Sequence, residues 1–231
     1  MAHDMNAAIS EPRFRTYLVA CGGDTDRAAA LYLANMRLSG AALESLHMFE
    51  VVLRNAIDLQ LRGWNSRHNG SQHWSLDPVP LLRGVLDGRG KLRDAEADAR
   101  KAVRSQKRDI THDDVLAQLS LGTWRYLLPS RRDAMKQKLW DEALIDAFPN
   151  LYSITPNTLT EWVSMSYDLR NRVAHFEPIF SRDLYARRRA MYRTIKTVSR
   201  GAQAWFGAND RFHQAVEDFY SEWPEHKGSK L

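Results

Sequence analysis

Residues 39–62 read SGAALESLHMFEVVLRNAIDLQLR, and this stretch decides the fold class. Apolar side chains recur in it at spacings of three and four, at Leu46, Phe49, Leu53 and Ala56. Such spacing places one apolar stripe on a helix, whereas a half-buried strand would show strict alternation. The stretch therefore predicts an amphipathic helix whose apolar side packs against other helices.

The same spacing continues through nearly the whole chain, and alternating segments bounded by turn signals are hard to find. We therefore predict an all-α protein with one helical domain over residues 1–221 and a flexible tail over 222–231. The longest loop is expected at 64–80, where histidine, glycine and proline are concentrated. The expected helices span 11–20, 25–37, 39–62, 88–107, 112–128 with a break near Gly122, 130–146, 156–175, 181–206 and 209–221.

The composition indicates which kind of partner and which cellular compartment to expect. The 231 residues carry a net charge of +5 with a pI near 9.4, which favours an anionic partner. The single cysteine, Cys21, leaves no intramolecular disulfide. No segment has the apolar length of a membrane span or the pattern of a secretion signal. We therefore expect a cytoplasmic protein without a membrane partner.

One segment of the helix expected at 156–175 combines residues suited to RNA cleavage. Residues 169–178 read LRNRVAHFEP, so that Asn171 follows Arg170 directly and His175 lies five positions beyond the arginine. Other arginine–histidine pairs at similar spacing run into the expected loop, and this pair alone begins on an amphipathic helix. At 100° per residue, Arg170 falls within about 40° of Leu159, on the apolar face. A guanidinium there requires a charged partner or a polar cleft.

Two interpretations of Arg170 stay open. In the first, it forms a structural ion pair with an acid of the helix at 39–62, where Glu50, Arg54 and Asp58 follow one another at spacings of four. In the second, Arg170 belongs to a site that faces a helix of a second subunit. For the three charges themselves, an ion ladder along a solvated face is one interpretation, and support by one of them of a charged site on a facing helix is the other.

The position of His175 depends on where its helix ends. Pro178 disfavours a helical conformation at Glu177, which places His175 in or just beyond the last turn. The terminal carbonyls there favour an imidazolium. On a straight helix His175 would lie about 140° around the axis from Arg170, so the two side chains converge only if the helix end relaxes. A helix cap is the alternative role for this histidine.

The segment directly after the motif is the most basic in the chain. Between residues 181 and 200 the only acid is Asp183, and Tyr185 and Tyr192 lie among the basic residues. A surface of this kind combines phosphate contacts with base stacking and predicts RNA binding. A solvated face matched to an acidic protein surface is the alternative. The predicted RNA-binding residues are Arg172, Arg182, Arg187, Arg188, Arg189, Arg193 and Lys196.

Other chemistries lack their motifs. The sequence has no CxxC pair, no HExxH helix and no glycine-rich phosphate loop. His68 and His73 lie five apart in the expected loop without a convincing set of further ligands. We therefore assign neither a metal nor a cofactor.

Five segments, at 13–18, 30–35, 49–57, 119–124 and 169–175, are similar to those of a known family. The most specific is LRNRVAH at 169–175, which resembles an iRN-x-x-AH signature, and LSLGTW at 119–124 resembles an lsfG-x-w segment. The family is the Abi-like group of bacterial abortive-infection proteins, which belongs to the HEPN superfamily. After His175 the sequence departs from the family pattern.

The resemblance implies a HEPN-type helical bundle with additional helices, and a homodimer in which two arginine–histidine motifs face a shared cleft. It also implies a metal-independent endoribonuclease that acts in phage defence or as a toxin, the latter held by an antitoxin protein or RNA. We expect His175 to move protons, Arg170 to stabilise charge on the phosphate, and Asn171 to orient either group. Because some relatives are non-catalytic, a dimeric RNA-binding or protein-interaction module is the alternative.

Overall fold

The computed structural model describes residues 9–68, 70–87 and 90–227. The predicted all-α class is confirmed for these residues, which form helices and no strand, with one isolated bridge between Ser130 and Asp133. The start of the helix expected at 88 and the last four residues of the expected tail lie outside the described residues. Within the described part, none of the helices combines the length and the hydropathy that a bilayer span requires.

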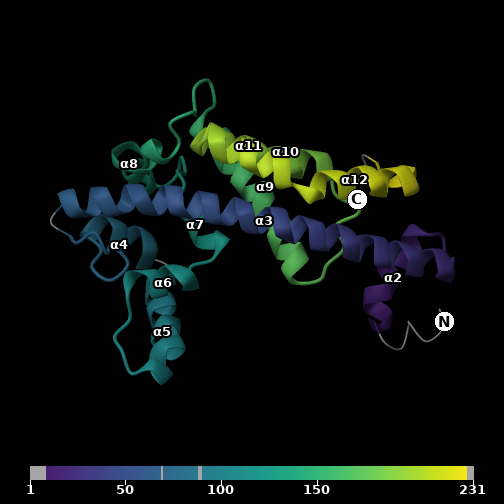
Figure 1. Ribbon diagram of the computed structural model, residues 1–231, viewed down its shortest axis with the longest axis horizontal. Coiled ribbons are helices and arrows are strands. Elements are labelled where there is room, and N and C mark those ends of the chain that lie inside the picture. Colours follow the sequence, from purple (N-terminus) through teal and green to yellow (C-terminus); the bar gives the residue numbers. More distant parts are fainter. Residues whose placement is uncertain (1–8, 69, 88–89, 228–231) are drawn as a thin grey trace.

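The fold is organised around α3, a helix of 43 residues from Thr25–Arg67 that runs the length of the molecule (Figure 1). Asp24 caps its start by accepting a hydrogen bond from the amide of Arg27 at 3.0 Å. The prediction of two helices, 25–37 and 39–62, was wrong because the buried stripe continues without a break from Leu38 to Ala42. Gly40 lies on the exposed side, where it costs only about 1 kcal/mol relative to alanine.

Four C-terminal helices and one N-terminal helix pack against α3. Helix α9 (Pro156–Ala174) crosses it near the middle, and α10 (Leu184–Val198), α11 (Arg200–Asn209) and α12 (Arg211–Glu222) follow on one side (Figure 1). Helix α2 (Glu11–Ala20) packs on the N-terminal part of α3. The single helix expected at 181–206 is two helices, because Ser199 is extended and caps α11 through the amide of Ala202.

The middle of the chain forms a set of short helices at the other end of α3 (Figure 1). The expected break in 112–128 falls at Leu119 and Ser120, and the helix expected at 130–146 begins later, after the Asp133 cap. One helix was missed, although Leu82, Val85 and Leu86 have helical spacing and are buried. The elements are α4 (Pro80–Asp87), α5 (Lys91–Val103), η1 (Arg104–Gln106), α6 (His112–Gln118), α7 (Leu121–Leu127), α8 (Ala134–Glu142) and η2 (Leu144–Ala147).

A buried polar cluster fixes the segment between α3 and α4 to the rest of the fold. The carboxylate of Asp58 accepts hydrogen bonds from Arg62 Nε at 2.7 Å and Trp74 Nε1 at 2.7 Å, and lies 2.9 Å from His112 Nε2. The other ring nitrogen of His112 lies 2.7 Å from the hydroxyl of Ser75. We call these five residues the Asp58 cluster. The cluster joins α3, α6 and the loop expected at 64–80. Specific hydrogen bonds therefore hold this loop in place.

The expected flexible tail also differs from the structure. Helix α12 extends to Glu222, and a short helix, η3 (Pro224–His226), follows it. Trp223 and His226 are buried, with the His226 ring 5.0 Å from the ring of Phe180. The chain therefore remains packed on the core as far as these aromatic rings.

Candidate functional site

Helix α9 carries the predicted motif and directs part of it toward α3. Thr155 caps the helix by accepting from the amide of Thr158 at 3.2 Å, and Pro156 occupies the first turn. Leu159, Val163 and Val173 are buried on the side that packs on α3. Arg170 is half-buried, as its predicted place beside this apolar face requires.

Arg170 belongs to a charged cluster between α3 and α9. Burial raises the pKa of Glu50, and the positive charge of Arg170 is the largest effect that opposes this rise. The backbone amide of Leu121 and the charges of Arg54 and His47 also oppose it. The predicted Glu50 thus lies within the electrostatic reach of Arg170 and Arg54, whose positive charges oppose the effect of burial on this half-buried carboxyl group.

Asn171 lies beside the arginine. Its amide oxygen accepts a hydrogen bond from Arg170 Nη1 at 3.4 Å. The distance is long, so the bond is weak. The contact places Asn171 beside the guanidinium, and its role in orienting the arginine or the phosphate stays a prediction.

His175 is exposed at the point where α9 ends. Its backbone amide donates to the carbonyl of Asn171 at 2.9 Å, and the chain then reverses. The amide of Phe176 donates to the carbonyl of Val173 and the amide of Glu177 to that of Arg172, which is a Schellman arrangement. The reversal leaves the imidazole of His175 free to reach solvent or a substrate at the helix end.

Phe176 occupies the one position of this reversal that favours glycine. Its φ is 56°, and its side chain is 75% exposed. A side chain in this left-handed region costs about 1–2 kcal/mol. A large apolar residue in a strained and exposed position at the motif is better explained by a function of the side chain than by stability.

We expect Phe176→Gly to raise the free energy of unfolding by about 1 kcal/mol, because glycine adopts this conformation without strain. Urea denaturation of the two proteins measures the difference. Phe176→Ala is the control, since it removes the ring and keeps the strain. Equal stability of the glycine and alanine variants would show that the backbone at this position is not strained.

Two of the predicted RNA-binding residues are engaged inside the protein, which corrects the prediction for them. The side chain of Arg187 is only 13% exposed, and it contacts Asp168 at 2.8 Å and the carbonyl of Met165 at 2.8 Å. Burial lowers the pKa of Arg187, and Asp168 offsets part of that effect. Arg188 pairs with the buried Asp210 at 2.5 Å. These arginines attach α10 to its neighbours.

Three of the predicted cations remain on the outer side of α10. Arg189, Arg193 and Lys196 are exposed at spacings of four and three, which places them on one face. Arg193 lies over the ring of Trp162, with 5.6 Å between the guanidinium and the ring centroid. Arg189, Arg193 and Trp162 line a cavity of about 290 Å³ between α9 and α10. Cations and an aromatic ring meet here, but the ring is Trp162 of α9 and not the predicted Tyr185 or Tyr192 of α10.

The other two predicted cations lie near the motif and are half-buried. Arg172 pairs with Glu177 across the helix end at 3.1 Å. Arg182 lies in the segment between α9 and α10. Within the described chain, the Nε atoms of both arginines are buried without a hydrogen-bond partner. Each of these two arginines therefore keeps one buried donor that the described chain does not use.

Asp58 lies away from Glu50, which corrects its predicted role in supporting Arg170. It is occupied in the Asp58 cluster. Eight residues of α3 separate it from Glu50, a rise of about 12 Å along the axis. The charges at spacings of four therefore do not form one uniform ladder.

Sequence reasoning missed two residues near the motif. His47 is exposed on α3 and acts electrostatically on Glu50. Trp162 of α9 meets the basic face of α10. The signal for His47 was its position three residues before Glu50, on the same side of one helix. Trp162 gave no comparable signal, because its contact depends on how α9 and α10 pack.

Comparisons with known proteins do not assign the chain to a family. No protein-family model matches the sequence, and no match was found among curated proteins or among solved structures. No group of three potential metal-ligating side chains converges in the described ranges. The function is therefore argued from the motif and its surroundings.

Proposed function

We propose that this protein is a metal-independent, HEPN-type endoribonuclease whose centre is Arg170, Asn171 and His175. The observation that carries the proposal is the arrangement at the end of α9. A half-buried arginine shares the environment of Glu50, its neighbour Asn171 contacts it, and an exposed histidine follows where the helix ends. A positively charged group near the phosphate and a histidine open to solvent are what phosphoryl-group chemistry on a large substrate requires.

RNA supplies its own nucleophile, so the protein needs only to position the strand and move protons. The 2′-oxygen forms a bond to phosphorus while the bond between phosphorus and the 5′-oxygen breaks. One proton leaves the 2′-hydroxyl and one is delivered to the 5′-oxygen. His175 performs one of these transfers, and Arg170 neutralises the charge that develops on the phosphoryl oxygens. The products are a 2′,3′-cyclic phosphate and a 5′-hydroxyl.

The second proton transfer requires a second group, and a homodimer supplies it as the His175 of another copy. Apolar side chains beside the motif support self-association on this face. Phe176 is 75% exposed, and Met36 and Leu43 are each 54% exposed. All three line a cavity of about 310 Å³. Exposed apolar residues that gather around a depression are typical of a protein–protein contact.

The biological setting rests on the resemblance of the motif and of four other segments to Abi-like proteins. We propose a role in bacterial phage defence or as a toxin controlled by an antitoxin protein or RNA. A second candidate function, a non-catalytic dimeric RNA-binding or protein-interaction module, is favoured by the proximity of Arg170 to Glu50. In such a module, Arg170 would occupy the same position but would form a structural ion pair with Glu50.

We propose that RNA binds to the outer face of α10, whether the protein is a ribonuclease or a non-catalytic RNA-binding module. We expect Arg189→Gln with Arg193→Gln to weaken binding of single-stranded RNA and to reduce the slope of log K against log salt by about 1.4, or about 0.7 per lost phosphate contact. Fluorescence anisotropy across a salt series measures this slope.

The matched control is Arg83→Gln with Arg104→Gln, which removes the same charge from exposed positions of α4 and η1. An unchanged slope in the α10 variant, or an equal fall in the control, would place the RNA path elsewhere.

A further inference from the structure

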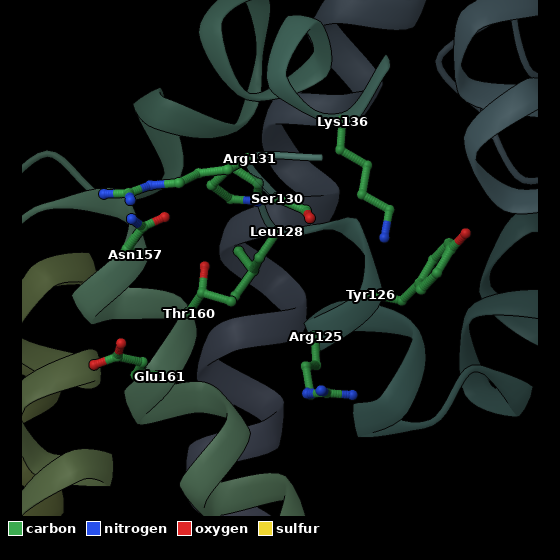
Figure 2. Close-up of a pocket in the computed structure, with 10 residues that line it drawn as sticks. Arg125, Tyr126, Leu128, Ser130, Arg131, Lys136, Asn157, Thr160 and Glu161 are labelled. Atoms are coloured by element: carbon green, nitrogen blue, oxygen red, sulfur yellow. The ribbon is translucent and has the colours of Figure 1, made fainter. Parts of the chain in front are cut away.

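A second basic site lies between the segment that joins α7 to α8 and the N-terminal half of α9. It is a cavity of about 520 Å³, and Figure 2 shows side chains around it. Arg125, Arg131 and Lys136 line it and lie on different sides in that view. The volume falls within the roughly 300–1,000 Å³ of small-molecule sites.

Arg131 is held in place by an amide. With the Asn157 amide turned so that its oxygen faces the guanidinium, that oxygen accepts from Arg131 Nε at 2.7 Å and Nη2 at 2.8 Å. The remaining terminal nitrogen stays available for another acceptor. Among the described residues no carboxylate pairs with Arg131, so its charge is not neutralised by the fold.

Arg125 is positioned in a similar way without an acidic partner in the described chain. Its Nε donates to the hydroxyl of Ser164 at 2.9 Å, and its guanidinium lies over the ring of Tyr167 at 5.0 Å. These contacts fix the plane of the guanidinium and leave its terminal donors for a ligand.

Lys136 is the third cation and is 8% exposed. Its ammonium lies 3.4 Å from the ring centroid of Tyr126 and 3.8 Å from Asp133. The cavity wall contains one acid, Glu161, against three cations, a formal balance of 3 − 1 = +2. With Asp133 included, the balance is still +1. A concave surface with this excess attracts anions.

We propose that this cavity binds the phosphoryl group of a phosphate ester. Arginine donates two parallel hydrogen bonds to phosphate oxygens, and lysine supplies a compact charge. The hydroxyls of Ser130 and Thr160, which also line the cavity, add neutral donors. Thr160 lies ten residues before Arg170 on α9, about 15 Å along the axis, so this site is separate from the motif and goes beyond the proposed function.

The phosphoryl group has two sources with the same chemistry, a phosphorylated small molecule or the backbone of an RNA strand. Titration of the purified protein with inorganic phosphate, adenosine monophosphate and a short single-stranded RNA, followed by calorimetry, separates them. Binding of either small phosphate assigns the site to a small molecule. If only the RNA binds, and if Arg131→Gln weakens that binding, the site is assigned to the RNA strand.

We expect Arg131→Gln and Arg125→Gln each to weaken the observed binding by at least about tenfold, because each removes a charged hydrogen-bonding group. Arg132→Gln is the matched control, because Arg132 is exposed, adjacent in sequence and absent from the cavity wall. A loss of small-phosphate binding in Arg131→Gln and Arg125→Gln that Arg132→Gln does not share tests this site apart from the motif. Failure of all three probes to bind, or equal weakening by Arg132→Gln, would overturn the proposal.

Discussion

His175→Ala is expected to lower the rate of RNA cleavage by roughly 10²–10⁴-fold, the usual contribution of a general acid or base. The stability of the variant should stay within about 0.5 kcal/mol of the wild type. The side chain of His175 is exposed. Within the described chain, the backbone of His175 forms a hydrogen bond at the helix end and its imidazole forms none. Cleavage of a labelled single-stranded RNA and urea denaturation measure the two quantities.

His213→Ala is the matched control, because His213 is also an exposed histidine but lies on α12. It should cleave RNA as the wild type does. Arg170→Ala should lose cleavage to a similar extent, and Arg170→Lys should recover only part of it because an ammonium lacks the planar fork of a guanidinium. Full activity in a folded His175→Ala protein would remove the histidine from the mechanism.

Asp58→Ala is expected to cost about 3–5 kcal/mol of stability, since it leaves the buried partners of the carboxylate unpaired. Burial alone would raise the pKa of Asp58, but hydrogen bonds from His112, Arg62 and Trp74 outweigh it and hold the pKa below its ordinary value of 3.8. The contribution of the ionised carboxylate is therefore present above about pH 3.8 and is lost as the pH falls through the lower, folded-state pKa.

Urea denaturation at neutral pH and in acid tests this prediction. Asp98→Ala is the control, because Asp98 pairs with Lys101 on the surface of α5, where solvent screens the interaction and the pair contributes little to stability. A loss of less than about 1 kcal/mol in Asp58→Ala would show that the Asp58 cluster does not hold the fold together.

The helical class and the bounds of α9 were predictable because their signals are local. Thr155, Pro156 and the spacing of Leu159 and Val163 mark the start and the buried side of that helix without reference to the rest of the chain. The continuity of α3 was not predictable from the same signals. Gly40 is a local reason to end a helix, whereas packing against several other helices is the non-local reason that it continues.

The charged residues also differ in how far the sequence predicts their surroundings. Sequence suggested Glu50, Arg54 and Asp58 as possible support for Arg170, and of these Glu50 lies within the electrostatic reach of the arginine. It did not separate Arg187, which is buried against Asp168, from Arg189, which is exposed two positions later. Which cation of a basic helix turns inward depends on the neighbouring helix and not on the helix itself.

The Asp58 cluster shows the limit of reasoning from spacing. Asp58 and His112 are separated by 54 positions, and nothing near either residue indicates the other. The regular spacing of Glu50, Arg54 and Asp58 favoured one common role for the three charges. Packing of α6 and of the segment before α4 gives Asp58 a different one.

Cleavage of RNA by 2′-hydroxyl attack without a metal is recognised by the chemical ends of the products. Purified wild-type protein is incubated with labelled single-stranded RNA in excess EDTA, beside an all-deoxy strand of the same sequence. We expect RNA fragments with 2′,3′-cyclic phosphate and 5′-hydroxyl ends and an intact deoxy strand. Intact RNA, fragments with 5′-phosphate ends, or cleavage of the deoxy strand would contradict it.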